Sequence, residues 1–168
     1  MQRIFIILLV LLGLSYGYLR FVGFDPQDRR PGTRLSGVEA TLPADLGKLA
    51  DAGEVHIETH PWYGIPFSVT TVIATDSGRL FVPSIYESVQ VFPGSKFWNR
   101  VVAADPRVRL RVDGQLYPME IHPLLDEAEF QKAFDALGRK YPYWREQVRV
   151  DRSEARFAML ELRRRESR

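Results

Sequence analysis

The sequence predicts a mainly β domain of the α+β class: a small antiparallel barrel with two short helices, preceded by an apolar N-terminal helix. About six segments alternate apolar and polar residues or are rich in β-branched residues, and tight-turn sequences separate most of them. Two intervening segments have helical spacing instead. Strands that follow one another in hairpin order favour an antiparallel barrel over a doubly wound sheet.

The N-terminal segment, residues 1–24, predicts a membrane anchor. Ile4 to Leu19 (IFIILLVLLGLSYGYL) carries no charge, and the apolar stretch runs on to residue 24 if the Arg20 side chain snorkels. About 20 helical residues cross a hydrocarbon core of ~30 Å, so the segment is long enough to span a bilayer. Three aromatic residues would then lie at the membrane interface, as an aromatic belt: Tyr16, Tyr18 and Phe21.

A secretory signal peptide is the alternative, with a weak cleavage site at Ser15 and Gly17. For an uncleaved anchor, the distribution of positive charge favours a cytoplasmic C-terminal domain over a periplasmic or other extracytoplasmic one. Only Arg3 precedes the apolar run, whereas Arg20 and the arginines of residues 29–34 follow it.

Composition divides the remainder of the chain into a linker and one domain. Residues 25–44 are rich in Pro, Gly and charged residues, which predicts a flexible linker, and residues 45–168 would form the barrel. The net charge is +2 with the signs interspersed, which gives no basic face for nucleic acid. The chain has no cysteine, which excludes disulfides, thiolate metal sites and cysteine nucleophiles.

The first half of the domain predicts a short helix and three strands. The helix is expected at residues 45–50. Residues 54–60 alternate, residues 67–75 are dense in β-branched side chains, and residues 79–84 form a returning strand after the turn Asp76-Ser77-Gly78.

On the first of these strands, His56, Glu58 and His60 share one face. Such residues can ligate a metal, but neighbouring positions on one strand face lie about 6.8 Å apart and rarely converge on one ion. We expect a solvated strand face here and no metal site.

A helix and a hairpin follow. Ser95 is the expected N-cap of a helix over residues 96–104, which Asp105-Pro106 ends. Residues 107–113 then alternate arginine with aliphatic residues, and Asp113-Gly114 predicts a tight turn into a strand over residues 115–121. The arginines of this strand predict its solvated outer face, with a phosphate-binding row as the alternative, and are Arg107, Arg109 and Arg111.

The C-terminal part predicts one more helix and one more strand. Asp126 is the expected N-cap of a helix through Leu137, with an apolar stripe that includes Phe130 and Phe134 and a left-handed stop at Gly138. Residues 155–162 form the last strand, and residues 163–168 a charged tail.

In this order, the segments resemble the FMN/deazaflavin-binding split β-barrel oxidoreductases, most closely the deazaflavin-dependent nitroreductase family. The resemblance covers residues 54–162. It is carried by the hairpin over residues 64–84, Trp98 eight residues before Pro106, the strand 107–113 with its hairpin, and Tyr141-Pro142-Tyr143. It implies a split β-barrel of about six mostly antiparallel strands, with FMN or a deazaflavin in a groove of the barrel and pairing into a homodimer.

The resemblance also implies roles for particular residues. The cofactor-binding residues would be Ser68, Thr70, Ser84, Lys96 and Trp98. The substrate-binding residues would be Trp62, Tyr63, Tyr141 and Trp144. No catalytic side chain is indicated, as expected where a cofactor carries the chemistry.

The chain departs from the family in its phosphate-binding loop. Where the family has a basic loop, this chain has HPWYGIPF at residues 60–67, with Phe67 in place of an arginine, and Val101 replaces an asparagine after the helix tryptophan. A cofactor phosphate would lose at least two charge-assisted hydrogen bonds, each worth roughly 1.5–3 kcal/mol.

Two functions remain open. The first is a membrane-anchored oxidoreductase that transfers hydride through a flavin or deazaflavin to a small or lipophilic acceptor, such as a quinone. The second is a non-catalytic split barrel that has lost the phosphate loop and holds a haem-like or hydrophobic ligand, or a membrane partner.

Overall fold

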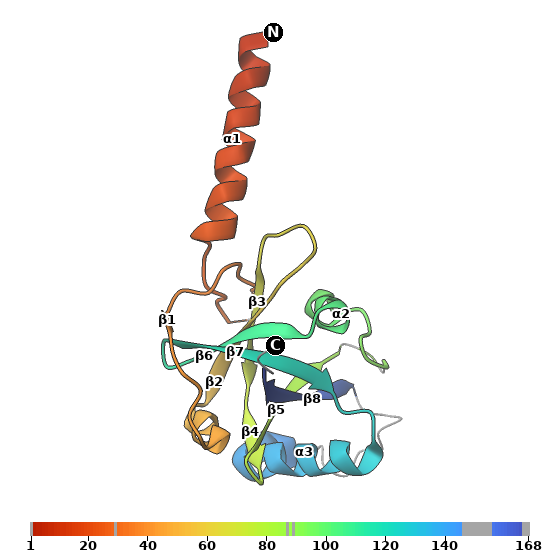
Figure 1. Cartoon of the computed structure of the whole chain (residues 1–168). Helices are drawn as coiled ribbons and strands as arrows, with labels where there is room; N and C mark the ends of the chain where they lie inside the picture. Colours follow the sequence, from red (N-terminus) through yellow and green to blue (C-terminus); the bar gives the residue numbers. More distant parts are fainter. Residues whose placement is uncertain (1, 29, 87, 89, 146–155, 166–168) are drawn as a thin grey trace.

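A computed structural model describes residues 2–28, 30–86, 88, 90–145 and 156–165. The chain begins with one long helix that stands away from a curled sheet, and a further helix covers the far end of that sheet (Figure 1). The helices are α1 (Gln2–Phe21), α2 (Phe97–Ala104), α3 (Glu127–Lys140) and α4 (Pro142–Arg145), with a 3₁₀ helix η1 at Leu46–Asp51. The strands are β1 (Val38–Glu39), β2 (Glu54–Thr59), β3 (Phe67–Val72), β4 (Ala74–Asp76), β5 (Arg79–Ile85), β6 (Arg107–Val112), β7 (Gln115–Pro123) and β8 (Phe157–Arg164).

The strands form one largely antiparallel sheet in the order β3-β2-β6-β7-β8-β5-β4, and β1 pairs in parallel with β7. The sheet curls so that β3 lies beside β5, where the Thr71 hydroxyl donates a hydrogen bond to the Pro83 carbonyl at 3.1 Å. Asp113 and Gly114 both have positive φ, as the tight β6–β7 turn requires. The predicted antiparallel split barrel is therefore confirmed.

Two apolar clusters lie on the two sides of the curled sheet. The first fills the barrel, where Val108, Leu110 and Val112 of β6 meet Trp98 of α2. The second lies under α3 and α4 and is built around Phe134. The alternation of β6 thus predicted its inward face correctly.

The predicted strand over residues 67–75 is interrupted at Ile73. The Ile73 carbonyl accepts hydrogen bonds from Lys140 Nζ and from the Tyr141 hydroxyl, both at 2.9 Å. Because Lys140 and Tyr141 bind the Ile73 carbonyl, this carbonyl does not continue the ladder of strand hydrogen bonds. The segment is therefore divided into β3, which pairs with β2, and β4, which pairs with β5.

The predicted helix caps are partly wrong. Asp126 does cap α3, since its side chain accepts from the Glu129 N–H, but Gly138 is buried within the helix instead of ending it. The helix continues to Lys140, whose ammonium donates to the carbonyls of η1 and the segment after it. Ser95 does not cap α2, because Lys96 occupies the N-cap position without a side-chain cap.

The last strand is longer than predicted at its C-terminal end. It runs through Arg164, so the first residues of the expected charged tail belong to the sheet. Residue 155, the predicted start of this strand, and residues 166–168 of the tail lie outside the described residues.

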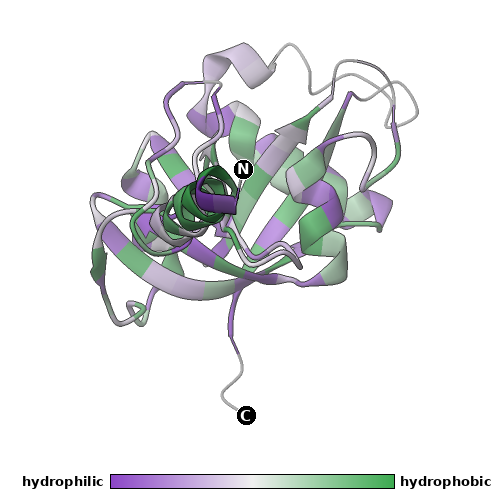
Figure 2. Ribbon diagram, turned by 90° about the horizontal axis from the view of Figure 1, so that it is seen from above, coloured by the Kyte–Doolittle hydropathy of each residue, from purple (hydrophilic) through white to green (hydrophobic). Residues whose placement is uncertain are grey.

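Helix α1 is mainly green in the view down its axis, with a purple N-terminal end (Figure 2), and none of its described residues is buried. Its length and composition suffice to cross a membrane, and an N-terminal signal sequence has the same properties. A buried core helix, by contrast, would have its apolar face covered.

The segment predicted to be a flexible linker, residues 25–44, packs against the barrel in its described part, and we call it the strap. Gly32 forms an antiparallel bridge with Ser68 of β3, and β1 extends the sheet beside β7. Leu35 is 3% exposed. These contacts argue that the strap belongs to the folded unit, whereas its composition alone predicts a tether.

Candidate functional site

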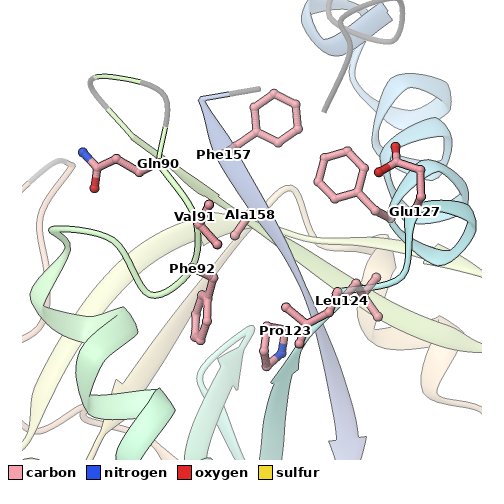
Figure 3. Close-up of a pocket in the computed structure, with 10 residues that line it drawn as sticks. Gln90, Val91, Phe92, Pro123, Leu124, Glu127, Phe157 and Ala158 are labelled. Atoms are coloured by element: carbon pink, nitrogen blue, oxygen red, sulfur yellow. The ribbon is translucent and has the colours of Figure 1, made fainter. Parts of the chain in front are cut away.

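An open cleft of about 410 Å³ lies between the loop before α2, the end of β7, the start of α3 and the first residues of β8 (Figure 3). This volume falls within the range of small-molecule sites, which is roughly 300–1,000 Å³. The cleft is lined by Gln90, Val91, Phe92, Pro123, Leu124, Leu125, Glu127, Phe130, Phe157 and Ala158.

The chemistry of this lining is mainly apolar. Two side chains bring polar groups, Gln90 and Glu127, and the described residues of the lining include no lysine, arginine or histidine. The Gln90 amide is already oriented, because it donates to the Ser88 hydroxyl at 3.1 Å and accepts from the Ser95 N–H at 2.6 Å. The cleft therefore suits a flat apolar ring and offers no cation to a phosphate.

The hydroxyls that the resemblance implies as phosphate ligands lie elsewhere. Ser68 and Ser84 are 0% and 1% exposed, and their Oγ atoms, like Oγ1 of Thr70, have no hydrogen-bond partner among the described residues. Such buried hydroxyls are costly and could in principle hold a ligand. Here Gly32 of the strap bridges the Ser68 backbone, and Ser84 is buried in the sheet, where it pairs with Ala158 of β8, so their binding roles stay predictions.

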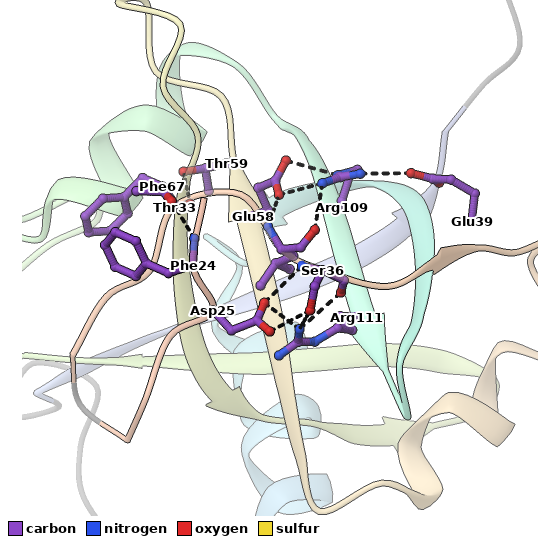
Figure 4. Close-up of polar contacts among 11 residues, drawn as sticks. Phe24, Asp25, Thr33, Ser36, Glu39, Glu58, Thr59, Phe67, Arg109 and Arg111 are labelled. Carbon is purple, nitrogen blue, oxygen red and sulfur yellow. Dashed lines mark hydrogen bonds and ion pairs between the residues drawn. The ribbon is translucent and has the colours of Figure 1, made fainter. Parts of the chain in front are cut away.

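Two arginines of β6, Arg109 and Arg111, form ion pairs with acidic side chains of β2, β1 and the strap (Figure 4). Arg109 donates to both carboxylate oxygens of Glu58, at 3.0 and 2.7 Å, and to Glu39 at 2.8 Å. Arg111 pairs with Asp25 at 2.6 Å. The Arg109 and Arg111 side chains are only 14% and 13% exposed, so the predicted solvated row is wrong for both, because the strap covers them.

Asp25 shows how tightly the strap is held. Burial by itself raises the pKa of this carboxyl, but hydrogen bonds from Arg111 and Ser36 outweigh it and lower the pKa to about 2. The Ser36 N–H and hydroxyl donate to the two oxygens at 3.0 and 2.6 Å. The ionised carboxylate therefore fixes the strap to β6.

Helix α2 presents Trp98 and Lys96 differently. Trp98 is 5% exposed and packs in the barrel core, so its ring is not available as a wall of the cleft. Lys96 is half-buried at the helix N-terminus. The binding roles of both residues stay predictions.

The sequence reasoning missed a buried polar pair behind α2. Asn99 is 0% exposed, and its amide donates to the Tyr86 hydroxyl at 2.9 Å and to the Pro93 carbonyl at 3.1 Å. Burial raises the pKa of the Tyr86 phenol despite the bond from Asn99. The sequence signal for this pair was an asparagine beside Trp98 on the apolar face of a short helix. The hydrogen bonds of Asn99 stabilise the loop that borders the cleft.

The predicted substrate side is divided between two places. Trp62 and Tyr63 lie in the β2–β3 loop beside the base of α1, while Tyr141 and Trp144 lie with α3 and α4 at the other end of the sheet (Figure 1). The Tyr141 hydroxyl bonds to backbone carbonyls of Gly53 and Ile73, and Trp144 is 6% exposed. The structure does not bring these four residues together, and none of them lines the cleft.

The predicted strand face with His56 and Glu58 is likewise occupied by structural contacts. The Glu58 carboxylate accepts from Arg109 and from the Leu35 N–H, the latter at 2.6 Å. Among the described residues, no group of three metal-ligating side chains comes together.

Comparison with known proteins supports the fold. HutZ, the haem storage protein from Vibrio cholerae, matches with a TM-score of 0.52 at 9% identity, covering 76% of this chain and 93% of that one. A protein assigned to 5-nitroimidazole antibiotic resistance in Bacteroides thetaiotaomicron matches with a TM-score of 0.50 at 10% identity, covering 82% and 89%. A conserved hypothetical protein from Mycobacterium tuberculosis gives 0.50 at 12% identity, covering 76% and 87%.

No protein-family model and no curated protein sequence matches the chain. At such low identities, the structural likeness establishes the split-barrel fold and not an activity. The narrower assignment to the deazaflavin-dependent nitroreductases stays a prediction.

Proposed function

We propose that the chain is a membrane-anchored split-barrel protein that holds a flat, largely apolar ring in the cleft between the loop before α2 and α3. The observation that carries this proposal is the open cleft itself, with mainly apolar walls and no cationic side chain among the described residues that line it. Helix α1 supplies the anchor, with the barrel on the cytoplasmic side by the distribution of arginines around it.

A flavin or deazaflavin ring is the occupant that the sequence resemblance implies. When bound, such a ring would accept and donate hydride, and the chain would act as an oxidoreductase on a small or lipophilic acceptor. The chain's own residues contribute apolar walls from Phe92, Leu124 and Phe157, which exclude water from the ring. A phosphate tail does not fit the predicted phosphate residues, for the reasons of burial and charge given above.

A non-catalytic apolar-ligand carrier is the second candidate, and the mainly apolar lining favours it. A haem is a poor occupant of the described part of the cleft, because the residues that line it include no histidine, methionine, tyrosine or cysteine to ligate iron.

Titration with riboflavin tests both candidates. Full-length protein in detergent is expected to quench riboflavin fluorescence, and A158F, which places a ring in the cleft, is expected to abolish the quenching. W62F, a change outside the cleft, should leave it intact. Catalysis is then tested by reducing the bound riboflavin chemically and following its reoxidation as it transfers hydride to a soluble quinone. Equal binding by wild type and A158F would contradict the cleft, and binding without turnover would favour the carrier.

A further inference from the structure

The β2–β3 loop, residues 60–66, lies beside the C-terminal end of α1 (Figure 1). The Tyr16 hydroxyl donates to the Tyr63 carbonyl at 3.1 Å, and Arg20 Nη1 donates to the Gly64 carbonyl at 3.0 Å. Arg20 also donates to the Tyr16 hydroxyl at 3.2 Å. Two hydrogen bonds therefore hold a loop of the barrel at a fixed height along the apolar helix, and the third, within α1, joins the two donors.

That height corresponds to the membrane interface if α1 spans the bilayer. At about 1.5 Å per residue, 20 helical residues cover roughly 30 Å, the thickness of the hydrocarbon core. Tyr16 lies five residues before the helix end at Phe21, or about 7.5 Å, which is within the zone where tyrosine and snorkelling arginine concentrate. The loop that they hold must lie in the same zone.

The side chains of this loop suit that zone. Trp62 is 95% exposed, although tryptophan is on average one of the more buried residue types. Its ring meets Tyr63 edge-on at 5.7 Å, and Tyr63 stacks on Phe97 of α2 at 6.3 Å, with both of these half-exposed. The Phe67 ring packs edge to face against the Phe97 ring at a centroid distance of 4.9 Å and so holds Phe97 beneath Tyr63 in the cluster.

We infer that the β2–β3 loop is a second membrane contact, in which Trp62 inserts at the lipid headgroup level beside α1. The occupant of this aromatic surface is the bilayer that holds the anchor, and the inference rests on the anchoring part of the proposed function. A single helix leaves a domain free to rotate, whereas a helix and a lipid-facing loop joined by Tyr16 and Arg20 fix one face of the barrel to the membrane. Trp62 and Tyr63 then orient the domain and do not bind substrate.

Lipid quenching of tryptophan fluorescence tests this directly. The full chain is reconstituted into phosphatidylcholine vesicles with plain acyl chains or with chains brominated near the carbonyl end. Of the three tryptophans, Trp98 and Trp144 are 5% and 6% exposed, so lipid-quenchable emission should come from Trp62. The brominated lipid is expected to quench wild type, and W62F should lose most of that quenching. W98F, which removes a buried tryptophan, should keep it.

Three outcomes overturn the inference. They are no quenching of wild type, equal quenching of wild type and W62F, and protection of Trp62 from aqueous iodide without lipid quenching, which would indicate a protein partner or a second copy. Flotation of the vesicles after alkaline extraction reports the anchor separately. Flotation without Trp62 quenching removes only the loop contact, whereas failed flotation removes both the anchor and the inference, and riboflavin binding reports the cleft independently of either.

Discussion

Two aromatic clusters occupy the two ends of this barrel and differ in what covers them. The helix cluster, formed by Phe130, Phe134, Trp144 and Phe157, is buried beneath α3 and α4, with Phe134 and Phe157 stacked at 4.6 Å. The loop cluster, formed by Trp62, Tyr63, Phe67 and Phe97, lies beside α1 and leaves Trp62 95% exposed. Similar residues thus build a hydrophobic core at one end and a surface for an apolar environment at the other.

This comparison also separates the means by which each end is held. Around the helix cluster, ring packing dominates. On the side of the loop cluster, the strap and α1 are joined to the barrel by ion pairs and hydrogen bonds around Arg109, Asp25 and Arg20. The first end should therefore respond mainly to loss of apolar volume, and the second to loss of charge.

Removing a ring from each cluster gives the largest expected contrast. F134A deletes a side chain that is 1% exposed, and it should lower the free energy of unfolding by about 3–5 kcal/mol. W62A should change it by no more than about 0.5 kcal/mol. Chemical denaturation in detergent measures both, and a large loss in W62A would show that the loop cluster is a core.

Breaking the ion pair under the strap should have the next largest effect. R109M leaves the fully buried Glu58 carboxylate without its main partner, which should cost about 3 kcal/mol. The matched control is R107M on the same strand, whose side chain is 55% exposed beside Asp105 and should contribute little to the free energy of unfolding. Equal costs for the two variants would contradict the covered position of Arg109.

The attachment of the strap should also depend on pH through Asp25. Its folded pKa of about 2 lies below the usual carboxyl pKa of 3.8, so the carboxylate stabilises the folded state fully above about pH 4, and this contribution disappears as the pH falls towards 2. We expect wild type to be more stable than D25N at neutral pH and the difference to vanish near pH 2. Denaturation midpoints of the two proteins across this range measure it, and a difference that grows at low pH would have the wrong sign.

The smallest effect is expected from the bond between α1 and the β2–β3 loop. Y16F removes one donor to the Tyr63 carbonyl, which is worth about 0.5–1.5 kcal/mol. Hydrogen exchange of residues 62–66 should accelerate, while exchange in β7 stays unchanged. Y18F, on the same helix, is the control and should leave the loop as it is.

The sequence predicted the regular part of the molecule because each strand carries its own local signal. The alternation of residues 107–112 and the Asp113-Gly114 turn specify β6 and β7 without help from distant residues. The signal for helix α1 is similarly local. The break at Ile73 and the continuation of α3 past Gly138 depend on Lys140 and Tyr141, which reach across the fold and have no local signature.

The candidate site was harder to predict for the same reason. Trp62-Tyr63 and Tyr141 to Trp144 look alike in sequence, and only the topology shows that they lie at opposite ends. The strap reads as a linker by composition, yet it meets partners on β2 and β6 that are distant in the chain. The cleft is formed by four separate segments, and the sequence of each segment alone does not predict it.

The proposed function depends most on a cleft that binds a flat ring and does not bind a phosphate. The direct measurement is the ratio of the dissociation constants of FMN and riboflavin for the full-length protein, since these ligands share one ring and differ by the phosphate. We expect riboflavin to bind at least as tightly as FMN. Glu127 borders the cleft, and the described residues of its lining include no cation that could pair with the FMN phosphate. FMN binding tenfold or more tighter than riboflavin, about 1.4 kcal/mol, would contradict the account and restore a phosphate site in the barrel.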